Sequence, residues 1–261
     1  MKILVFVKQV PDTDDVKLDP KTGNIMREGV ASKLNPLDAN AVEAAIQLKE
    51  KYGAQVCAIS MGPPQAEDVL KKALALGCDE AYLLSDRAFG GADTLATSYT
   101  LAMAARKIGD YDLLLFGRHA VDGDTAQTGP QIGEKLDCAV VTYLEKLDLD
   151  GNVAIATRDI GTGVETCRAK LPALFTVTEK FGELRPYEMR RVMKYKNAEP
   201  TILDCAAIGC EDDRCGFAGS PTSVNKIESV VLAGGEFKEV AATDEGIGGL
   251  VAELIKDHTI G

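Results

Sequence analysis

The 261-residue sequence contains no tryptophan and only two histidines. It has no G-x-S-x-G and no H-E-x-x-H motif, so nucleophilic catalysis finds little support in it. It also lacks a G-x-G-x-x-G after its first apolar run and a G-x-x-x-x-G-K-[ST], which excludes the Rossmann fingerprint and the P-loop. No apolar run approaches the roughly 20 residues that a membrane-spanning helix needs. These absences leave a globular protein in which none of these motifs identifies the chemistry.

Positive charge is scarce: 29 Lys and Arg residues face 40 Asp and Glu residues, which gives a net charge of −11. Such a chain repels phosphate backbones, so it is a poor binder of nucleic acid or anionic membranes. Any bound phosphate must be held locally, by backbone N–H groups and a few basic side chains. Met1 and Lys2 lead into only five apolar residues, too short for a secretory signal. We therefore expect a cytoplasmic protein with free thiols.

Three of the seven cysteines, Cys205, Cys210 and Cys215, are evenly spaced. The spacing contains no C-x₂-C pair, and His119 and His258 are far from it in the sequence. Zinc sites usually combine such pairs with nearby histidines. The spacing therefore favours no metal site.

Apolar runs alternate with helical patterns in the first two-thirds of the chain. The predicted strands are 3–7, 56–59, 81–84 and 113–116, and the predicted helices are 37–52, 65–76, 94–108 and 129–136. Gly53, Gly77 and Gly109 end the first three helices, as C-capping glycines do. This alternation predicts an α/β fold, a parallel sheet with helices on both faces and right-handed crossovers.

The pattern changes beyond residue 138. Runs 140–147, 153–158, 166–171 and 174–177 predict strands of an antiparallel β extension, with turns at 150–152 and 161–163 and a break at Pro172. The basic segment 189–196 is predicted as a helix or an exposed loop. We expect two parts: a nucleotide-binding α/β domain, residues 1–200, and a C-terminal arm, residues 201–261, that packs on something else.

In a parallel α/β sheet, ligands bind beyond the carboxyl ends of the strands. The segments that follow the four predicted strands are rich in Gly, Pro, Asp and Thr, and are residues 8–13, 60–64, 85–94 and 117–130. Gly90, Gly91 and Ala92 allow close backbone approach, and Asp93 and Thr94 open a helix whose N–H groups suit a phosphate. The alternative is that these are ordinary turns without a ligand. The residues alone thus indicate a nucleotide-binding α/β protein of unproved chemistry.

Four motifs, together with the segment 165–173, resemble the beta (small) subunit of electron transfer flavoprotein. The motifs are Val7-Lys8-Gln9-Val10-Pro11, Leu34-Asn35-Pro36, Ser60-Met61-Gly62-Pro63-Pro64 and the run from Asp122 to Pro130. They spread over most of residues 1–180. Gly161-Thr162-Gly163 departs from the family pattern, which has an acidic residue and paired small residues there.

The resemblance extends to one of two kinds within the family. The segment from Asp86 to Ser98 is similar to that of the electron-bifurcating kind, which holds a second FAD in this subunit and takes a hydride from NADH. The housekeeping kind holds AMP, and tends to have a third acid and a Cys-Asn where Gly123, Thr125 and Ala126 stand here. His119 replaces a Gln that is common in the family.

The resemblance implies a set of cofactor-binding residues at the strand ends. The adenosine part of the flavin would lie against Phe6, Val7, Lys8, Asn35 and Met61 and against the loop residues Gly117, Arg118, Ala120, Val121, Asp122, Gly123, Asp124, Thr125, Ala126, Gln127 and Thr128. The pyrophosphate and flavin side would lie near Ala92, Thr94 and Thr97. No catalytic side chain is implied, because the flavin carries the chemistry.

The resemblance also implies partners. The C-terminal arm would pack on the large (alpha) subunit, and a partner dehydrogenase would be recognised by Met189, Arg190, Val192, Met193 and Lys194. An electron carrier of this kind acts only in complex with its large subunit. It would send single electrons to ferredoxin or flavodoxin and to an acyl-CoA or 2-hydroxyacid dehydrogenase. The alternatives are a housekeeping carrier that takes single electrons from acyl-CoA dehydrogenases, and a non-redox nucleotide-sensing module.

Overall fold

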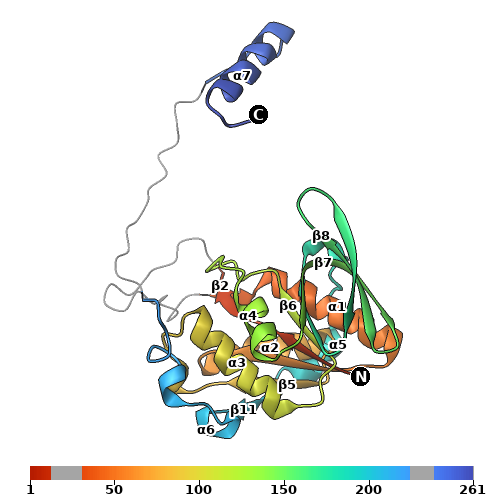
Figure 1. Ribbon diagram of the computed structural model, residues 1–261, viewed down its shortest axis with the longest axis vertical. Coiled ribbons are helices and arrows are strands. Elements are labelled where there is room, and N and C mark those ends of the chain that lie inside the picture. The colour runs from red at the N-terminus through yellow and green to blue at the C-terminus, as the bar shows by residue number, and fades with distance from the viewer. Residues whose placement is uncertain (13–30, 224–237, 261) are drawn as a thin grey trace. The chain divides into compact units, whose positions relative to one another are not determined.

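A nine-stranded sheet forms the centre of the protein in the computed structural model, which describes residues 1–12, 31–223 and 238–260 (Figure 1). The strand order is β11-β5-β4-β1-β6-β10-β7-β8-β9. The strands are β1 (Lys2–Phe6), β4 (Gln55–Met61), β5 (Glu80–Leu84), β6 (Leu113–Gly117), β7 (Ala139–Asp150), β8 (Val153–Asp159), β9 (Val164–Lys170), β10 (Ala173–Val177) and β11 (Thr201–Leu203). A separate antiparallel pair joins β2 (Gln9–Pro11) to β3 (Ser32–Leu34).

The strands from β11 to β7 pair in parallel, whereas β7, β8 and β9 form an antiparallel meander. β10 returns from the meander and lies between β6 and β7, parallel to both. The α/β fold with an antiparallel extension is therefore confirmed. The predicted break at Pro172 lies between β9 and β10.

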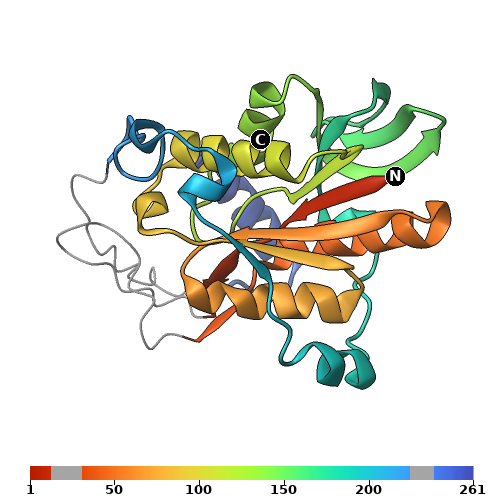
Figure 2. The same ribbon diagram turned by 90° about the horizontal axis from the view of Figure 1, so that it is seen from below.

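Helices cover both faces of the sheet, as the alternating pattern predicts (Figure 2). The helices α1 (Pro36–Tyr52) and α2 (Glu67–Leu76) pack on one face, and α3 (Thr94–Ile108) and α4 (Thr128–Lys135) pack on the other. Short 3₁₀ turns are η1 (Pro64–Ala66), η2 (Arg87–Phe89), η3 (Glu179–Phe181) and η4 (Asp212–Arg214). Gly53 ends α1 in the left-handed conformation, with φ 68°, and its N–H donates to Lys49 O. This is the C-cap that the sequence predicts.

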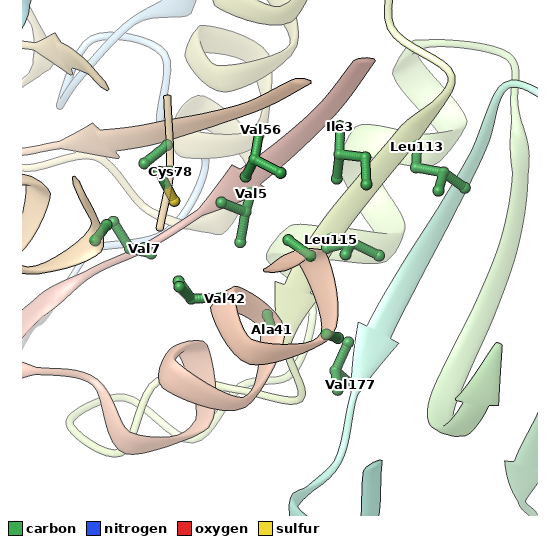
Figure 3. Close-up of a cluster of buried hydrophobic side chains, with 14 of the residues drawn as sticks. Ile3, Val5, Val7, Ala41, Val42, Val56, Cys78, Leu113, Leu115 and Val177 are labelled. Carbon is green, nitrogen blue, oxygen red and sulfur yellow. The ribbon is translucent and has the colours of Figure 1, made fainter. Parts of the chain in front are cut away.

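Alternate residues of each central strand bury toward opposite faces. Ile3 and Val5 of β1 lie in the same buried cluster as Leu115 of β6 and Val42 of α1 (Figure 3). Leu4 and Phe6 belong to the second core, under α3 and α4. The continuous apolar runs of the sequence reflect this double burial, which parallel strands require.

Residues 185–195 connect back to the α1 and α2 face. The basic segment forms the helix α5 (Met189–Tyr195), so the helical alternative is the observed one. The chain then pairs β11 with β5 and forms the short helix α6 (Cys205–Ile208), whose Cys205 and Ile208 are buried in the core under α3. The first part of the predicted arm therefore packs on the α/β domain of its own chain.

The chain divides into two units, Met1–Asn225 and Lys226–Gly261. The described part of the second unit contains α7 (Asp244–Lys256), whose N-cap Thr243 accepts a hydrogen bond from Gly246 N–H. None of the side chains of α7 is buried. Residues 224–237 and 261 of the predicted arm lie outside the described residues. No helix among the described residues is long and apolar enough to span a membrane.

Candidate functional site

The strand order reverses between β1 and β6, and we call the region formed by the loops at the carboxyl ends of these two strands the crevice. From β1 the chain moves outward through β4 and β5, then returns across β1 to form β6. Such a reversal separates the loops that follow the two neighbouring strands and opens the usual ligand site of α/β sheets. Phe6 and Phe116, at these two strand ends, stack with ring centroids 4.1 Å apart. The residues predicted from the resemblance follow these strands directly.

Asp38, which the sequence analysis missed, joins the loops of the crevice. Its Oδ2 accepts the Lys8 N–H at 2.8 Å, and its Oδ1 accepts the Gly117 N–H at 3.2 Å. A Cβ on residue 117 would lie 2.4 Å from Oδ1, so only glycine fits there. Burial raises the pKa of Asp38 to about 7, against hydrogen bonds from Lys8, Asn35 and Gly117 that lower it. An acidic residue in the first turn of a helix is ordinarily explained by its favourable interaction with the helix dipole. The sequence therefore gives no sign that Asp38 also binds the two loops.

Asn35 fixes the start of the 117–128 loop. Its Nδ2 donates to His119 O at 2.9 Å, and its Oδ1 accepts the Val121 N–H at 3.2 Å. Further along, Lys8 Nζ bonds Asp122 Oδ1 at 2.6 Å, and the Asp122 side chain is only 4% exposed. The predicted residues of β1, Asn35 and this loop thus form one connected group.

The basic side chains of the crevice already have acidic neighbours. Lys8 pairs with Asp122, Arg118 lies 3.9 Å from Glu179, and His119 Nε2 lies 3.0 Å from Asp124 Oδ1. A phosphate would therefore depend mainly on N–H groups and hydroxyls, which agrees with the acidity of the chain.

The N-termini of α3 and α4 lie next to each other. Thr94 Oγ1 donates to Gln127 Oε1 at 3.1 Å, and Gln131 Nε2 donates to Thr94 Oγ1 at 3.5 Å. The first N–H groups of two helices thus meet at one place, where their dipoles favour an anion.

The two helix starts are not equally open. At α3, Asp93 Oδ1 accepts the N–H groups of Leu95 and Ala96, so the expected free N–H groups are partly occupied by the cap. At α4, no side chain in the described part of the chain caps the start. The N–H groups at the start of α4 are therefore the better anion donors. Among the described residues, Gln131 Oε1 is buried without a hydrogen-bond partner, so a polar acceptor beside Thr94 is left for a ligand.

The remaining predicted residues line the same rim. Met61 ends β4, the neighbour of β1, and Ala92 and Thr97 flank the start of α3. In the 117–128 loop, the exposed residues are Val121, Gly123, Asp124, Thr125 and Gln127, and the half-buried ones are Arg118, Ala120, Asp122, Ala126 and Thr128. Asp124 and Ala126 adopt positive φ, 50° and 52°. These accessible small residues, together with the paired helix starts, fit a nucleotide cofactor.

The predicted dehydrogenase-recognition residues lie on α5, with Met189 74% and Met193 65% exposed. Arg190 and Lys194 are also exposed, and Val192 is half-buried. The neighbouring Arg191 turns inward, and its guanidinium donates to Leu74 O and Ala75 O, both at 2.9 Å. These carbonyls end α2, so Arg191 holds α5 in place while its neighbours stay accessible.

The family model described as "Electron transfer flavoprotein domain" matches residues 22–204. The chain belongs to the electron transfer flavoprotein beta-subunit family. The Caffeyl-CoA reductase-Etf complex subunit CarD of Acetobacterium woodii is 46% identical over the whole of both chains. The electron transfer flavoprotein subunit beta of Clostridium acetobutylicum is 43% identical, also over both whole chains. Protein FixA of Azorhizobium caulinodans is 40% identical over 98% of this chain and 94% of its own.

Membership of this family carries two general consequences. A beta subunit of electron transfer flavoprotein has an alpha-subunit partner, and the family is associated with flavin and nucleotide. Asn35 and the two neighbouring helix starts, at the carboxyl ends of β1 and β6, are the candidate place for such a group in this chain.

Proposed function

We propose that this chain is the small subunit of an electron-bifurcating electron transfer flavoprotein, and that it holds FAD in the crevice between β1 and β6. The observation that carries the proposal is the junction of two helix starts through Thr94 and Gln127, beside an open loop of small residues. The similarity over the full length to a subunit of a Caffeyl-CoA reductase-Etf complex supports the same assignment.

In this proposal the chain supplies binding and orientation. The adenosine half lies against the ends of β1 and β4 and the 117–128 loop. The pyrophosphate takes the N–H groups at the start of α4 beside Thr94, and the flavin end extends past Ala92 and Thr97. When bound, FAD supplies hydride acceptance and one-electron transfer.

The proposed electron path begins at NADH and divides. One electron goes to ferredoxin or flavodoxin, and the other goes through the large subunit to a dehydrogenase that docks on α5. The name of the Acetobacterium woodii relative favours a dehydrogenase acting on an acyl-CoA, with a 2-hydroxyacid dehydrogenase as the other candidate. The free thiols are in keeping with a cytoplasmic protein.

The housekeeping carrier is the second candidate, because the same crevice would accept AMP. Its phosphate needs only one helix start, whereas two adjoining starts suit a pyrophosphate. The third candidate is a non-redox nucleotide-sensing module. The exposed apolar side chains of α7 disfavour it, because they suit contact with a partner chain.

A cofactor count on the purified heterodimer separates these candidates. We expect two flavins per heterodimer, no AMP, and bleaching of the visible flavin spectrum on addition of NADH. One flavin with one AMP and no reaction with NADH would establish the housekeeping carrier instead. A stable homodimer of this chain that binds nucleotide without flavin would establish the sensing module.

A substitution at Gly123 tests the place of the cofactor. A Cβ at Gly123 meets nothing within 4 Å, and its φ is not in the left-handed region, so Gly123→Leu should fold. We expect flavin occupancy to fall about tenfold or more, because the new side chain stands in the crevice, a loss of about 1.4 kcal/mol. Gly163→Leu is the matched control, since Gly163 is equally open but lies between β8 and β9. Equal occupancy in both variants would remove the 117–128 loop from the site.

A further inference from the structure

Cys205, Cys210 and Cys215 come together in space, although four residues lie between each and the next. Their three Sγ atoms all lie within 4.8 Å of one another. Cys205 and Cys215 are buried and Cys210 is half-buried, and all three are free thiols. The loop reverses at Gly209, whose φ of 67° is left-handed, and Cys210 N–H donates to Cys205 O at 3.0 Å. The sequence has no C-x₂-C pair here, which argues against a metal site. The chain reversal nevertheless brings the thiols of Cys205 and Cys210 close together.

A carboxylate stands beside the thiols. Asp212 Oδ1 lies 3.5 Å from Cys205 Sγ. In a tetrahedral zinc site, sulfur ligands lie about 3.8 Å from one another and a carboxylate oxygen about 3.5 Å from each sulfur. The Asp212 oxygen is already at this distance from one sulfur, and the thiols need shifts of only about 1 Å. Iron–sulfur clusters usually take four cysteines, and among the described residues only three thiols converge here.

A hydroxyl group and a guanidinium group lie close to the cluster. Thr100 Oγ1, on α3, donates to Ala96 O at 3.0 Å and lies 3.8 Å from Cys215 Sγ. Arg214, next to Cys215 in the chain, places its guanidinium 4.1 Å from the centroid of the Tyr99 ring and pairs with Glu211 at 3.5 Å. Hydrogen bonds and charges around a metal site orient its ligands and tune their basicity.

The segment that carries these cysteines has few buried apolar residues of its own. Between β11 and residue 223 it contains only α6, η4 and turns, and Cys205, Ile208 and Cys215 are its buried apolar residues. Such segments are commonly stabilised by a metal when their own apolar burial is small.

We propose that Cys205, Cys210 and Cys215 form a binding site for one zinc ion, with the Asp212 carboxylate as the fourth ligand. Zinc binds as the three thiols lose their protons to solvent, so three Zn–S bonds replace three S–H bonds and no electron is transferred. The ion cross-links α6, η4 and the turn between them. The proposal rests on the positions of the cysteines and Asp212. The result of its test therefore does not depend on which nucleotide the crevice holds.

A zinc count on the full-length chain, incubated with Zn²⁺ under a non-thiol reductant and then desalted, tests this site. We expect about one zinc ion per chain, and less than about a tenth of that in the variant with all three cysteines replaced by serine. Cys167→Ser is the control, because Cys167 lies on β9 and should leave the count unchanged. Co²⁺ in place of Zn²⁺ should give the visible absorption of tetrahedral cobalt with thiolate-to-metal charge transfer. Less than about a tenth of an ion in the original chain, or full uptake by the triple variant, would overturn the site.

Two further measurements keep the test independent of folding defects. Cys210→Ser changes the half-buried thiol only, so it should fold, and its zinc affinity should fall about a hundredfold, while Asp212→Asn should weaken binding about tenfold. Zinc should raise the unfolding temperature of the original chain but not of the triple variant. Unchanged affinity in Cys210→Ser would overturn the site, and unchanged affinity in Asp212→Asn would overturn the role of Asp212. A disulfide between any two of the three cysteines in protein isolated without oxidant would also overturn it.

Discussion

Asp38 is a buried carboxyl group that holds two loops by accepting backbone N–H groups from Lys8 and Gly117. Desolvation disfavours its charged form, and the three hydrogen-bonding groups around it only partly compensate. The folded protein therefore keeps a proton on this group at pH values where the unfolded chain has lost it.

The pH dependence of stability follows from this difference. The pKa of Asp38 is about 7 in the folded protein, against 3.8 without the fold. Between these values the folded state binds more protons, so its stabilising contribution is full below about pH 4 and is lost as the pH rises to about 7. We expect the free energy of unfolding of the original chain, measured with urea relative to that of Asp38→Asn, to decline by up to about 1.4 kcal/mol per pH unit over this range. Parallel pH profiles for the two proteins would contradict the raised pKa.

Asp93 has two roles at the start of α3. One carboxylate oxygen caps the helix, and the other accepts hydrogen bonds from the N–H and hydroxyl of Thr222. Asp93 N–H in turn donates to Ser220 Oγ at 2.8 Å. The type of residue at position 93 predicts the helix cap. The hydrogen bonds to Ser220 and Thr222, about 130 residues further on, could not be predicted, because no local sequence pattern indicates them.

At the scale of elements, α5 depends on α2. Arg191 donates to two carbonyls at the end of α2, where a cation also interacts favourably with the helix dipole. Its neighbour Arg190 is exposed.

These neighbouring arginines allow a matched test. We expect Arg191→Ala to lower the free energy of unfolding by about 1–3 kcal/mol, because two charged hydrogen bonds are lost. Arg190→Ala should leave stability within about 0.5 kcal/mol and instead slow electron transfer to the partner dehydrogenase. Urea unfolding and a coupled dehydrogenase assay distinguish the two. If Arg190→Ala were the destabilising variant, our assignment of inward and outward arginines would be wrong.

The central elements could be predicted because their signals are local. Continuous apolar runs mark β1, β4 and β6, and Gly53, Gly77 and Gly109 mark the ends of α1, α2 and α3. The short strands β2, β3 and β11 could not be found, because three residues carry no periodic pattern. The position of β10 between β6 and β7 could not be found either, since it rests on pairing between distant segments. The candidate site residues were predicted through motif resemblance, whereas the contacts of Asp38 and the convergence of the three cysteines depend on the folding of segments that are distant or turned back on themselves.

At the scale of the whole chain, the second unit presents an unpacked helix. On α7 the exposed apolar side chains are Ile247, Leu250, Val251 and Ile255. Their spacing of three and four residues places them on one face. An apolar face of this kind suits burial against another chain, which supports the prediction that the arm packs on the large subunit.

A charge on this face tests that prediction. We expect Val251→Asp to weaken the heterodimer by about 2 kcal/mol, roughly thirtyfold in dissociation constant, because an aspartate would be buried at the interface. Val164→Asp is the control, since Val164 is 64% exposed on β9 and lies outside the arm. Co-purification of the tagged large subunit and analytical ultracentrifugation measure the effect. Equal assembly of both variants would show that α7 does not contribute to the interface.

The hydrogen bonds from Ser220 and Thr222 to Asp93 have a consequence for biosynthesis. The chain leaves the ribosome from its N-terminus, so α3 emerges long before residues 220–222 do. Until those residues arrive, Asp93 is held only by its own helix. Final ordering of the α3 start is therefore postponed until residues 220–222 have been synthesised and released.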